Sequence, residues 1–268
     1  MRDRAAVKQI KSARTAEELV NLVTLASGLG ETAWRERMRQ FGPEVVPLIS
    51  ERLKTVKNIR DKDTRDMIFE KLIAELRWRG DAGAEVLLER FDDLNNYGKG
   101  LACVTLGLLG AQASADKMWA FYQKARHNWR DTTHFVGPLW GLIDLKDERA
   151  GGALADLLSK GRGFYELFGF LSRAGDARAV VPLLWAMQKE ENMDAMMALL
   201  SIAHRIGRDA FLAEFDKVAW EEPREEREAF TDELLSKPAS AAEEYFASFY
   251  RGLTPEDVER VLPGGIGS

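Results

Sequence analysis

The side chains that could do chemistry at neutral pH are few in this sequence. It contains three histidines, His127, His134 and His204, and a single cysteine, Cys103. His204 lies in the apolar segment 198–206, where we expect a helix-surface or packing role. Cys103 lies in an apolar helical segment with no neighbouring base, so we expect a small buried hydrophobe rather than a nucleophile. One cysteine also excludes an intramolecular disulfide framework.

Known catalytic motifs are absent from the sequence. It has no HExxH helix, no P-loop, no GxGxxG after a strand and no GxSxG turn. Asp131 and His134 have a possible ligand spacing, but two ligands make a poor metal site. The sequence therefore predicts no metal and no cofactor, and it favours a protein that is not an enzyme.

The segment from Arg126 to His134 is richer in polar, aromatic and basic residues than a plain turn requires. Loops on a rigid scaffold are frequent sites of binding. We therefore predict a contact loop with Trp129 as the anchor and with Arg126, His127, Arg130 and His134 around it.

An alternative for this segment stays open. Trp129 would then pack back on the protein, and Asp131 or Thr132 would cap the following helix.

The elements that must position these residues are helices. Apolar residues recur at intervals of three and four, and no segment alternates strictly as a strand would. Two examples of such stripes are Val180, Leu183, Leu184 and Met187, and Ile68, Leu72, Ile73 and Leu76. Thr15 and Glu18 have the spacing of a capping box at a helix start. The pattern predicts an all-α protein.

Short junctions recur along the chain, most of them built on glycine. They are Phe41-Gly42-Pro43, Arg79-Gly80-Asp81, Leu109-Gly110-Ala111, Leu145-Lys146-Asp147, Ala174-Gly175-Asp176 and Ile206-Gly207-Arg208. Their spacing of roughly 30 to 40 residues is typical of α-solenoids with two helices in each repeat. We expect the glycine to take a left-handed conformation at the end of the first helix. The Asp or Pro that often follows suits the start of the second.

Three of these junctions carry a family resemblance. Gly175-Asp-Ala-Arg-Ala-Val-Val-Pro-Leu-Leu184 resembles the second-helix motif of HEAT repeats, particularly the short bacterial type found in phycobilisome-lyase-like proteins. Gly42-Pro-Glu-Val-Val-Pro-Leu-Ile49 and Gly80-Asp-Ala-Gly-Ala-Glu-Val-Leu-Leu88 are two further copies.

The resemblance implies a right-handed α-solenoid of about six HEAT-like helix pairs over residues 31–220. We expect residues 1–30 to form an N-terminal helical cap, since terminal repeats need a polar outer side. Residues 221–268 would form an acidic C-terminal helical cap, with the stripe Tyr245, Phe246, Phe249 and Tyr250 buried, and a flexible tail.

In HEAT-like solenoids the second helices line the concave face. Trp185 falls outside the apolar stripe of its helix, and its equivalents in the other repeats are small or acidic. They are Ser50, Glu89, Ala120, Asp156 and Glu214. This predicts an acidic ridge with one aromatic anchor, suited to a partner with a basic segment. The alternative is that Trp185 packs between neighbouring second helices.

The other tryptophans fall on or near apolar stripes, and we expect core packing for Trp34, Trp78, Trp119, Trp140 and Trp220. Gly137 and Gly141 flank Trp140 on one helix face, which predicts a close helix–helix contact there.

Composition is that of a soluble globular protein: 268 residues, 46% hydrophobic and 30% charged, with a net charge of −5. The first residues show no signal-peptide pattern, and no apolar run is long enough to cross a membrane. We therefore expect a cytoplasmic protein without a membrane partner. Lys and Arg exceed Asp and Glu by 17 to 12 in residues 1–80, whereas acidic residues predominate by 12 to 5 in residues 221–260.

The leading interpretation is a non-catalytic protein–protein interaction scaffold or adaptor that binds a protein or peptide on the concave face. An enzyme on a HEAT fold is the alternative. Alkylpurine DNA glycosylases use aromatic, Arg and Asp side chains like Trp129, Arg130 and Asp131, although not adjacent in one loop. Phycobilin lyase subunits resemble this chain in length and repeat type, yet no tetrapyrrole motif is present.

A third interpretation is nucleic-acid binding by the basic N-terminal residues Arg35, Arg37, Arg39, Arg52, Lys54, Lys57 and Arg60. Interspersed glutamates dilute this group. We therefore do not expect nucleic acid as a partner, because duplex binding depends on many phosphate contacts.

Overall fold

The chain forms helices throughout the part that the computed structural model describes, residues 2–127, 133–190, 192–218 and 223–249. These residues form sixteen α-helices and four short 3₁₀ helices, and no strand occurs among them. This confirms the all-α prediction. The described chain divides into two compact units, one that ends at Leu145 and one that begins at Lys146. We call them the N-terminal unit and the C-terminal unit.

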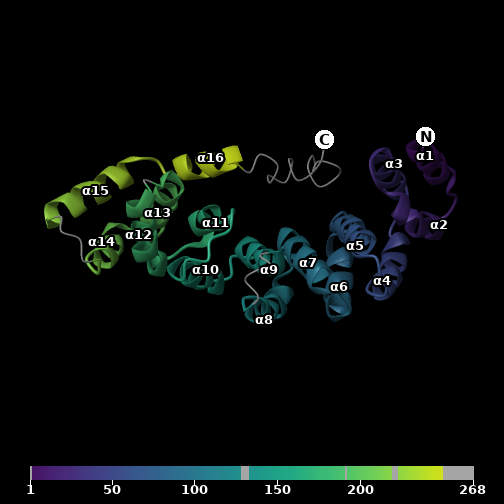
Figure 1. Ribbon diagram of the computed structural model, residues 1–268, viewed down its shortest axis with the longest axis horizontal. Helices are drawn as coiled ribbons and strands as arrows, with labels where there is room; N and C mark the ends of the chain where they lie inside the picture. Colours follow the sequence, from purple (N-terminus) through teal and green to yellow (C-terminus); the bar gives the residue numbers. More distant parts are fainter. Residues whose placement is uncertain (1, 128–132, 191, 219–222, 250–268) are drawn as a thin grey trace. The chain divides into compact units, whose positions relative to one another are not determined.

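The N-terminal unit holds nine helices (Figure 1). They are α1 (Arg2–Ser12), α2 (Ala16–Asn21), α3 (Leu29–Met38), α4 (Val45–Val56), α5 (Lys62–Arg77), α6 (Gly80–Arg90), α7 (Asn96–Leu108), α8 (Ala115–Ala125) and α9 (Thr133–Asp144). Helices two apart in the sequence pack together: α1 on α3, α2 on α4, α4 on α6, α5 on α7 and α7 on α9. Such packing arises when successive helix pairs stack, because each pair buries its apolar face on the next.

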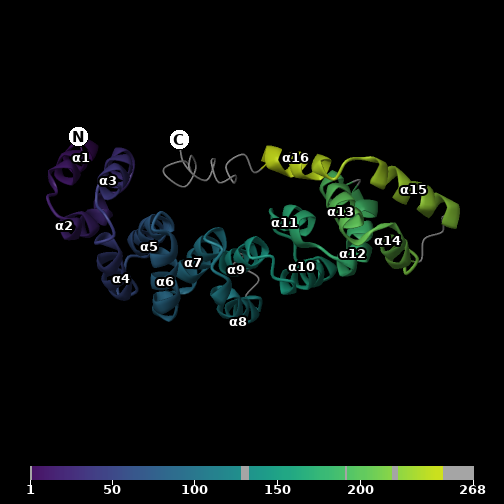
Figure 2. The ribbon, with the colours of Figure 1, turned by 180° about the vertical axis from the view of Figure 1, so that it is seen from behind.

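The C-terminal unit holds seven helices (Figure 2). They are α10 (Arg149–Ser159), α11 (Leu167–Ala174), α12 (Val180–Glu190), α13 (Met193–Ile206), α14 (Arg208–Phe215), α15 (Arg224–Ser236) and α16 (Ser240–Phe249). Alternate helices pack here too: α10 on α12, α12 on α14, α11 on α13 and α13 on α15. The predicted solenoid, its hand and its capped ends stay predictions.

All six predicted junctions lie where one helix ends and the next begins. A positive φ is present at Gly80, Gly110 and Gly207, with values of +54°, +67° and +84°, and also at Lys146, with +57°. Gly207 combines it with a ψ of 163°, which is an extended conformation and not the left-handed helical one. A side chain in the left-handed region is strained by about 1–2 kcal/mol, because Cβ approaches the following carbonyl.

The expectation of a positive φ is wrong for the remaining two junction glycines. Gly42 has no positive φ, and Gly175 is extended at φ −63° and ψ 150°. Gly175 is required for space instead, because a Cβ there would lie 2.4 Å from the Leu171 carbonyl oxygen and 2.6 Å from Ile202 Cδ1.

The start of α2 confirms the predicted capping box. Thr15 Oγ1 accepts a hydrogen bond of 3.1 Å from the backbone N–H of Glu18. The Glu18 carboxylate reaches back one residue further than the usual pattern and accepts from the backbone N–H of Arg14 at 2.7 Å. Two backbone donors are thereby satisfied at this helix end.

Helices α7 and α9 approach each other through glycines, as predicted for Gly137 and Gly141. A Cβ on Gly137 would lie 2.5 Å from the Gly100 carbonyl oxygen, and one on Gly141 would lie 2.4 Å from that of Cys103. Backbone atoms cannot give way as a flexible side chain can. This contact therefore depends on the absence of side chains at these positions.

Two kinds of side-chain contact recur at the helix junctions. In the first kind, Asp147 accepts hydrogen bonds from the backbone N–H and from the guanidinium of Arg149, two residues further along the chain. Asp176 holds Arg178 in the same way. The two Asp-x-Arg turns lie 29 residues apart in sequence, and each precedes the second helix of a pair.

In the second kind of contact, an arginine at the C-terminal end of one helix donates hydrogen bonds to backbone carbonyls. These carbonyls lie at the end of an earlier helix, two positions back in the helix order. Arg79 follows α5 and donates to the carbonyls of Met38 at 2.9 Å and Phe41 at 3.1 Å, after α3. Arg205, in the last turn of α13, donates to the carbonyls of Ser172, Arg173 and Gly175 at the end of α11. These carbonyls lack partners within their own helix.

The cores of the units confirm several residue predictions. Trp34 is fully buried, and its indole N–H donates to the Leu19 carbonyl at 2.8 Å. Cys103 is buried, and burial raises the pKa of its thiol. Phe246 is buried, while Tyr245 is partly buried and donates to the Asp194 carboxylate at 2.6 Å.

Other predictions of burial hold only in part. Trp119 and Trp140 are half-buried, and so is Trp78. Trp220 and Tyr250, together with the side chain of Phe249, lie outside the described part of the chain. None of the described helices combines the length and the apolar character that crossing a bilayer requires.

Candidate functional site

The predicted contact loop lies largely outside the described residues. Trp129 and Arg130 belong to the part that is not described, and so does the side chain of His134. Arg126 is half-buried at the end of α8, where its backbone N–H donates to the Tyr122 carbonyl at 2.9 Å, and His127 is exposed. The contact loop and its packing alternative both stay predictions.

The predicted ridge residues lie on alternate helices. Ser50, Glu89, Ala120, Asp156, Trp185 and Glu214 belong in turn to α4, α6, α8, α10, α12 and α14. Within the C-terminal unit, α12 packs on both α10 and α14, so the helix with Trp185 lies between those with Asp156 and Glu214.

Trp185 is 51% exposed, whereas its neighbours Leu183 and Leu184 are fully buried. The three residues share one helix, so the apolar stripe of α12 faces the core and Trp185 lies off it. This exposure contradicts the alternative in which Trp185 packs between second helices.

The acidic residues of the ridge are paired with bases one to four residues further along the chain. Asp156 contacts Lys160 at 2.7 Å, and Glu214 contacts Lys217 at 2.6 Å. Glu89 pairs with Arg90. Each of these three carboxylates thus has a cation beside it, and the acidic character of the ridge stays a prediction.

Most of the basic N-terminal residues are also engaged locally. Arg35 is buried and pairs with Glu31, Lys54 pairs with Glu51, and Lys57 contacts Asp93 at 3.2 Å. The sequence predicted a loose basic group, and the structure shows much of its charge neutralised within the unit.

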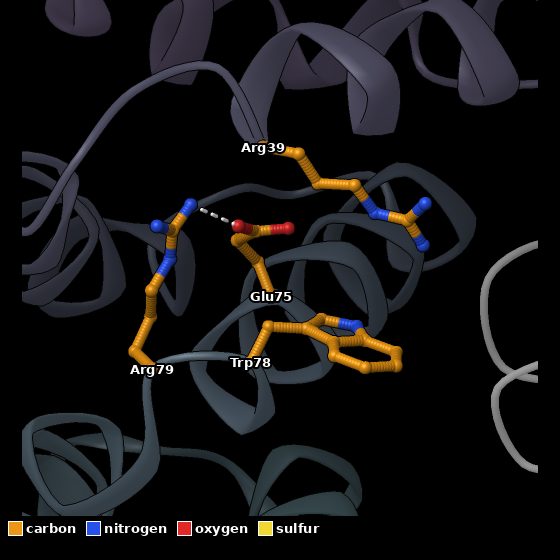
Figure 3. A pocket seen from close by; sticks show the side chains of 4 residues that line it. All are labelled: Arg39, Glu75, Trp78 and Arg79. Atoms are coloured by element: carbon orange, nitrogen blue, oxygen red, sulfur yellow. Dashed lines mark hydrogen bonds and ion pairs between the residues drawn. The ribbon is translucent and has the colours of Figure 1, made fainter. Parts of the chain in front are cut away.

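Arg39 belongs to a distinct site (Figure 3). It lines a pocket of about 510 Å³ together with Glu75, Trp78 and Arg79, at the C-terminal ends of α3 and α5. The Arg39 guanidinium lies over the Trp78 ring, 5.5 Å from its centroid, and Arg77 lies 5.3 Å from it. Stacked guanidinium groups of this kind are attracted by the π-face of the indole.

Glu75 forms the inner wall of the pocket. It is 3% exposed and pairs with Arg79 at 2.5 Å. Burial raises the pKa of the Glu75 carboxyl, and the charges of Arg79, Arg35 and Arg39 oppose that rise. Figure 3 shows one carboxylate oxygen directed to Arg79 and the other directed away from it. Arg79 is thus shared between this carboxylate and the carbonyls that follow α3.

Sequence reasoning missed this pocket, because it assigned Trp78 to the core. A signal was present in the helical phase. Ile68, Leu72 and Leu76 follow one stripe of α5, and position 78 is two residues beyond it, on the opposite side of the helix. What the sequence did not reveal is that Arg39, about 40 residues earlier, lies over the same ring.

Among the described residues, no group of three or more His, Cys, Asp or Glu is arranged to hold a metal ion. His204 is exposed on α13, as expected, and its Nε2 lies 2.8 Å from the Lys237 carbonyl oxygen.

Comparison with known proteins found no matching family model, no matching curated protein and no matching solved structure.

Proposed function

We propose that this protein is a non-catalytic binding module built from HEAT-like helix pairs, and that its C-terminal unit binds a partner protein or peptide through the face around Trp185. The observation that carries the proposal is the 51% exposure of Trp185 on α12. The packing of α12 between α10 and α14 gives this side chain a fixed base.

Three features support the repeat architecture. Helices pack on those two positions away in the sequence within both units. Asp-x-Arg turns recur at 147–149 and 176–178. Arg79 and Arg205 satisfy the ends of equivalent helices. Such repeats present extended surfaces for binding partners.

The exposure of Trp185 supports its role as an anchor. Tryptophan is enriched among residues whose truncation weakens protein–protein binding most, because its large ring is desolvated in a pocket of the partner. The pairs Asp156–Lys160 and Glu214–Lys217 lie at the C-terminal ends of α10 and α14, the helices that pack on α12. We therefore expect a partner that offers an apolar pocket or side chain to Trp185 and polar groups around it.

The proposal is tested by selecting peptides from a random display library on the full chain and measuring their affinity for the Trp185→Ala variant. We expect binding to weaken at least 30-fold, which corresponds to the roughly 2 kcal/mol that defines a strong anchor. Tyr165→Ala is the matched control, because Tyr165 is an aromatic residue of the same unit and is 73% exposed.

Thermal unfolding of both variants checks that the fold is intact. An equal affinity for the wild-type chain and the Trp185→Ala variant would overturn the proposal. So would a loss of several kcal/mol of stability in that variant, since it would show Trp185 to be a packing residue.

A further inference from the structure

We propose that the pocket formed by Arg39, Glu75, Trp78 and Arg79 in the N-terminal unit binds a small organic carboxylate that carries a hydrogen-bond donor beside its carboxylate group. This site belongs to a different unit from the Trp185 face and serves a small ligand rather than a partner protein. The two proposals can therefore fail independently.

The pocket carries more positive charge than its carboxylate balances. Arg79 is neutralised by Glu75, and Arg35 by Glu31. Arg39 has no ion pair among the described residues, and its side chain is exposed at the pocket. The pocket thus offers one positive charge that the protein does not balance at close range, which favours an anionic ligand.

The guanidinium of Arg39 is held beside the Trp78 ring. The Arg39 guanidinium carbon lies 5.5 Å from the centroid of the Trp78 ring, and this cation–π contact uses none of the N–H donors on a carboxylate. The donors therefore stay available for a ligand. A planar carboxylate matches this fork with two parallel hydrogen bonds. In Figure 3 the indole nitrogen of Trp78 lies on the edge of the ring toward Arg39, where its N–H can serve the same anion.

Glu75 restricts the charge of the ligand. Its carboxylate lines the pocket, so a dianion such as phosphate meets stronger repulsion than a single carboxylate does. Within the described chain Glu75 accepts one hydrogen bond, from Arg79 to Oε1. The second oxygen is directed away from Arg79 (Figure 3), so it can accept from a hydroxyl or N–H of the ligand.

The Trp78 ring and the volume of the pocket indicate a small ligand with an apolar part. The ring provides an apolar wall. A volume of about 510 Å³ is within the usual range for small-molecule sites.

The experiment is a titration of the full chain followed by the indole N–H signals of its tryptophans in ¹⁵N NMR spectra, with the Trp78→Phe variant to assign the signal of Trp78. Lactate is the probe, because it is a monoanion with a hydroxyl beside its carboxylate. Acetate lacks the hydroxyl, and inorganic phosphate tests the charge. We expect a saturable shift of the Trp78 signal with lactate, weaker binding of acetate and the weakest binding of phosphate.

The matched variants are Arg39→Gln and Arg60→Gln, which remove the same charge from the same unit. Both arginines are exposed, so both variants should fold. We expect lactate affinity to fall at least 10-fold in Arg39→Gln and to stay within twofold in Arg60→Gln. An unshifted Trp78 signal, an equal loss in both variants, or tighter binding of phosphate than of lactate would overturn the proposal.

Discussion

Trp185 and Trp78 both lie off the apolar stripe of a helix, yet their surroundings differ. Trp185 is 51% exposed, and an ion pair lies at the C-terminal end of each of the helices α10 and α14 that pack on α12. Trp78 is half-buried and stacked by the guanidinium groups of Arg39 and Arg77. An exposed tryptophan without a stacked cation offers mainly its own apolar surface. A tryptophan beside a guanidinium that has no ion pair holds that cation in a position where an anionic ligand can bind it. The neighbours, more than the residue type, thus distinguish a surface suited to proteins from one suited to a small anion.

Removal of Arg79 should cause the largest loss of stability at the Trp78 pocket. In Arg79→Met the buried Glu75 loses its cation, and the carbonyls after α3 lose their donors. We expect the free energy of unfolding to fall by about 4 kcal/mol, as for other buried pairs that lose one partner. Urea unfolding followed by circular dichroism measures this loss.

The double variant Arg79→Met/Glu75→Met is the control for that interpretation. It removes the unpaired carboxylate, so we expect part of the lost stability to return. If the double variant is no more stable than the single one, the burial of Glu75 is not the cause.

A substitution in the close contact of α7 and α9 tests whether the N-terminal unit can be destabilised without affecting the C-terminal unit. In Gly141→Ala the new Cβ would meet the Cys103 carbonyl, so we expect a loss of about 3 kcal/mol from overpacking. Hydrogen exchange measured by mass spectrometry should increase in peptides of the N-terminal unit and change little in the peptide with Trp185.

Gly163→Ala is the matched control, since a Cβ at Gly163 would meet no atom within 4 Å. Equal increases in exchange across both units of Gly141→Ala would contradict the prediction.

Arg205 in the C-terminal unit makes the same kind of carbonyl contacts as Arg79, so the stability lost on removing each arginine can be compared. Both satisfy carbonyls at the end of an earlier helix, but no ion pair joins Arg205 to a carboxylate among the described residues. We therefore expect Arg205→Met to lose only about 2 kcal/mol, the value of hydrogen bonds from a charged donor. The same urea titration measures it. A loss as large as that of Arg79→Met would show that the carbonyl contacts dominate in both.

The smallest expected effect is at Lys146, where the C-terminal unit begins. Its φ of +57° is natural for glycine and strained for lysine. We expect Lys146→Gly to stabilise the protein by about 0.5 kcal/mol, because relief of strain exceeds the added flexibility of the unfolded chain. Ser159→Gly, within α10, should destabilise it instead. A lower urea midpoint for Lys146→Gly would contradict the prediction.

The sequence by itself determined the helical class, the places where helices end, and several core residues. These are local properties: the stripe of Ile68, Leu72 and Leu76, the capping box at Thr15, and the junctions at Gly80, Gly110 and Gly207 depend on neighbours within a few residues. It also indicated correctly that Gly137 and Gly141 permit a close helix contact.

Only the tertiary structure decided which charges are paired and which tryptophan accompanies which cation. Arg39 contacts Trp78, and Lys57 contacts Asp93, although the partners lie about 40 residues apart in the sequence. Helical periodicity describes only neighbours within a few residues, so it does not predict such contacts. Gly175 shows the same limit, since its role is to leave room for Ile202 of another helix. Local sequence specifies where a helix ends and which side is apolar. Packing between helices decides what the remaining side chains can bind.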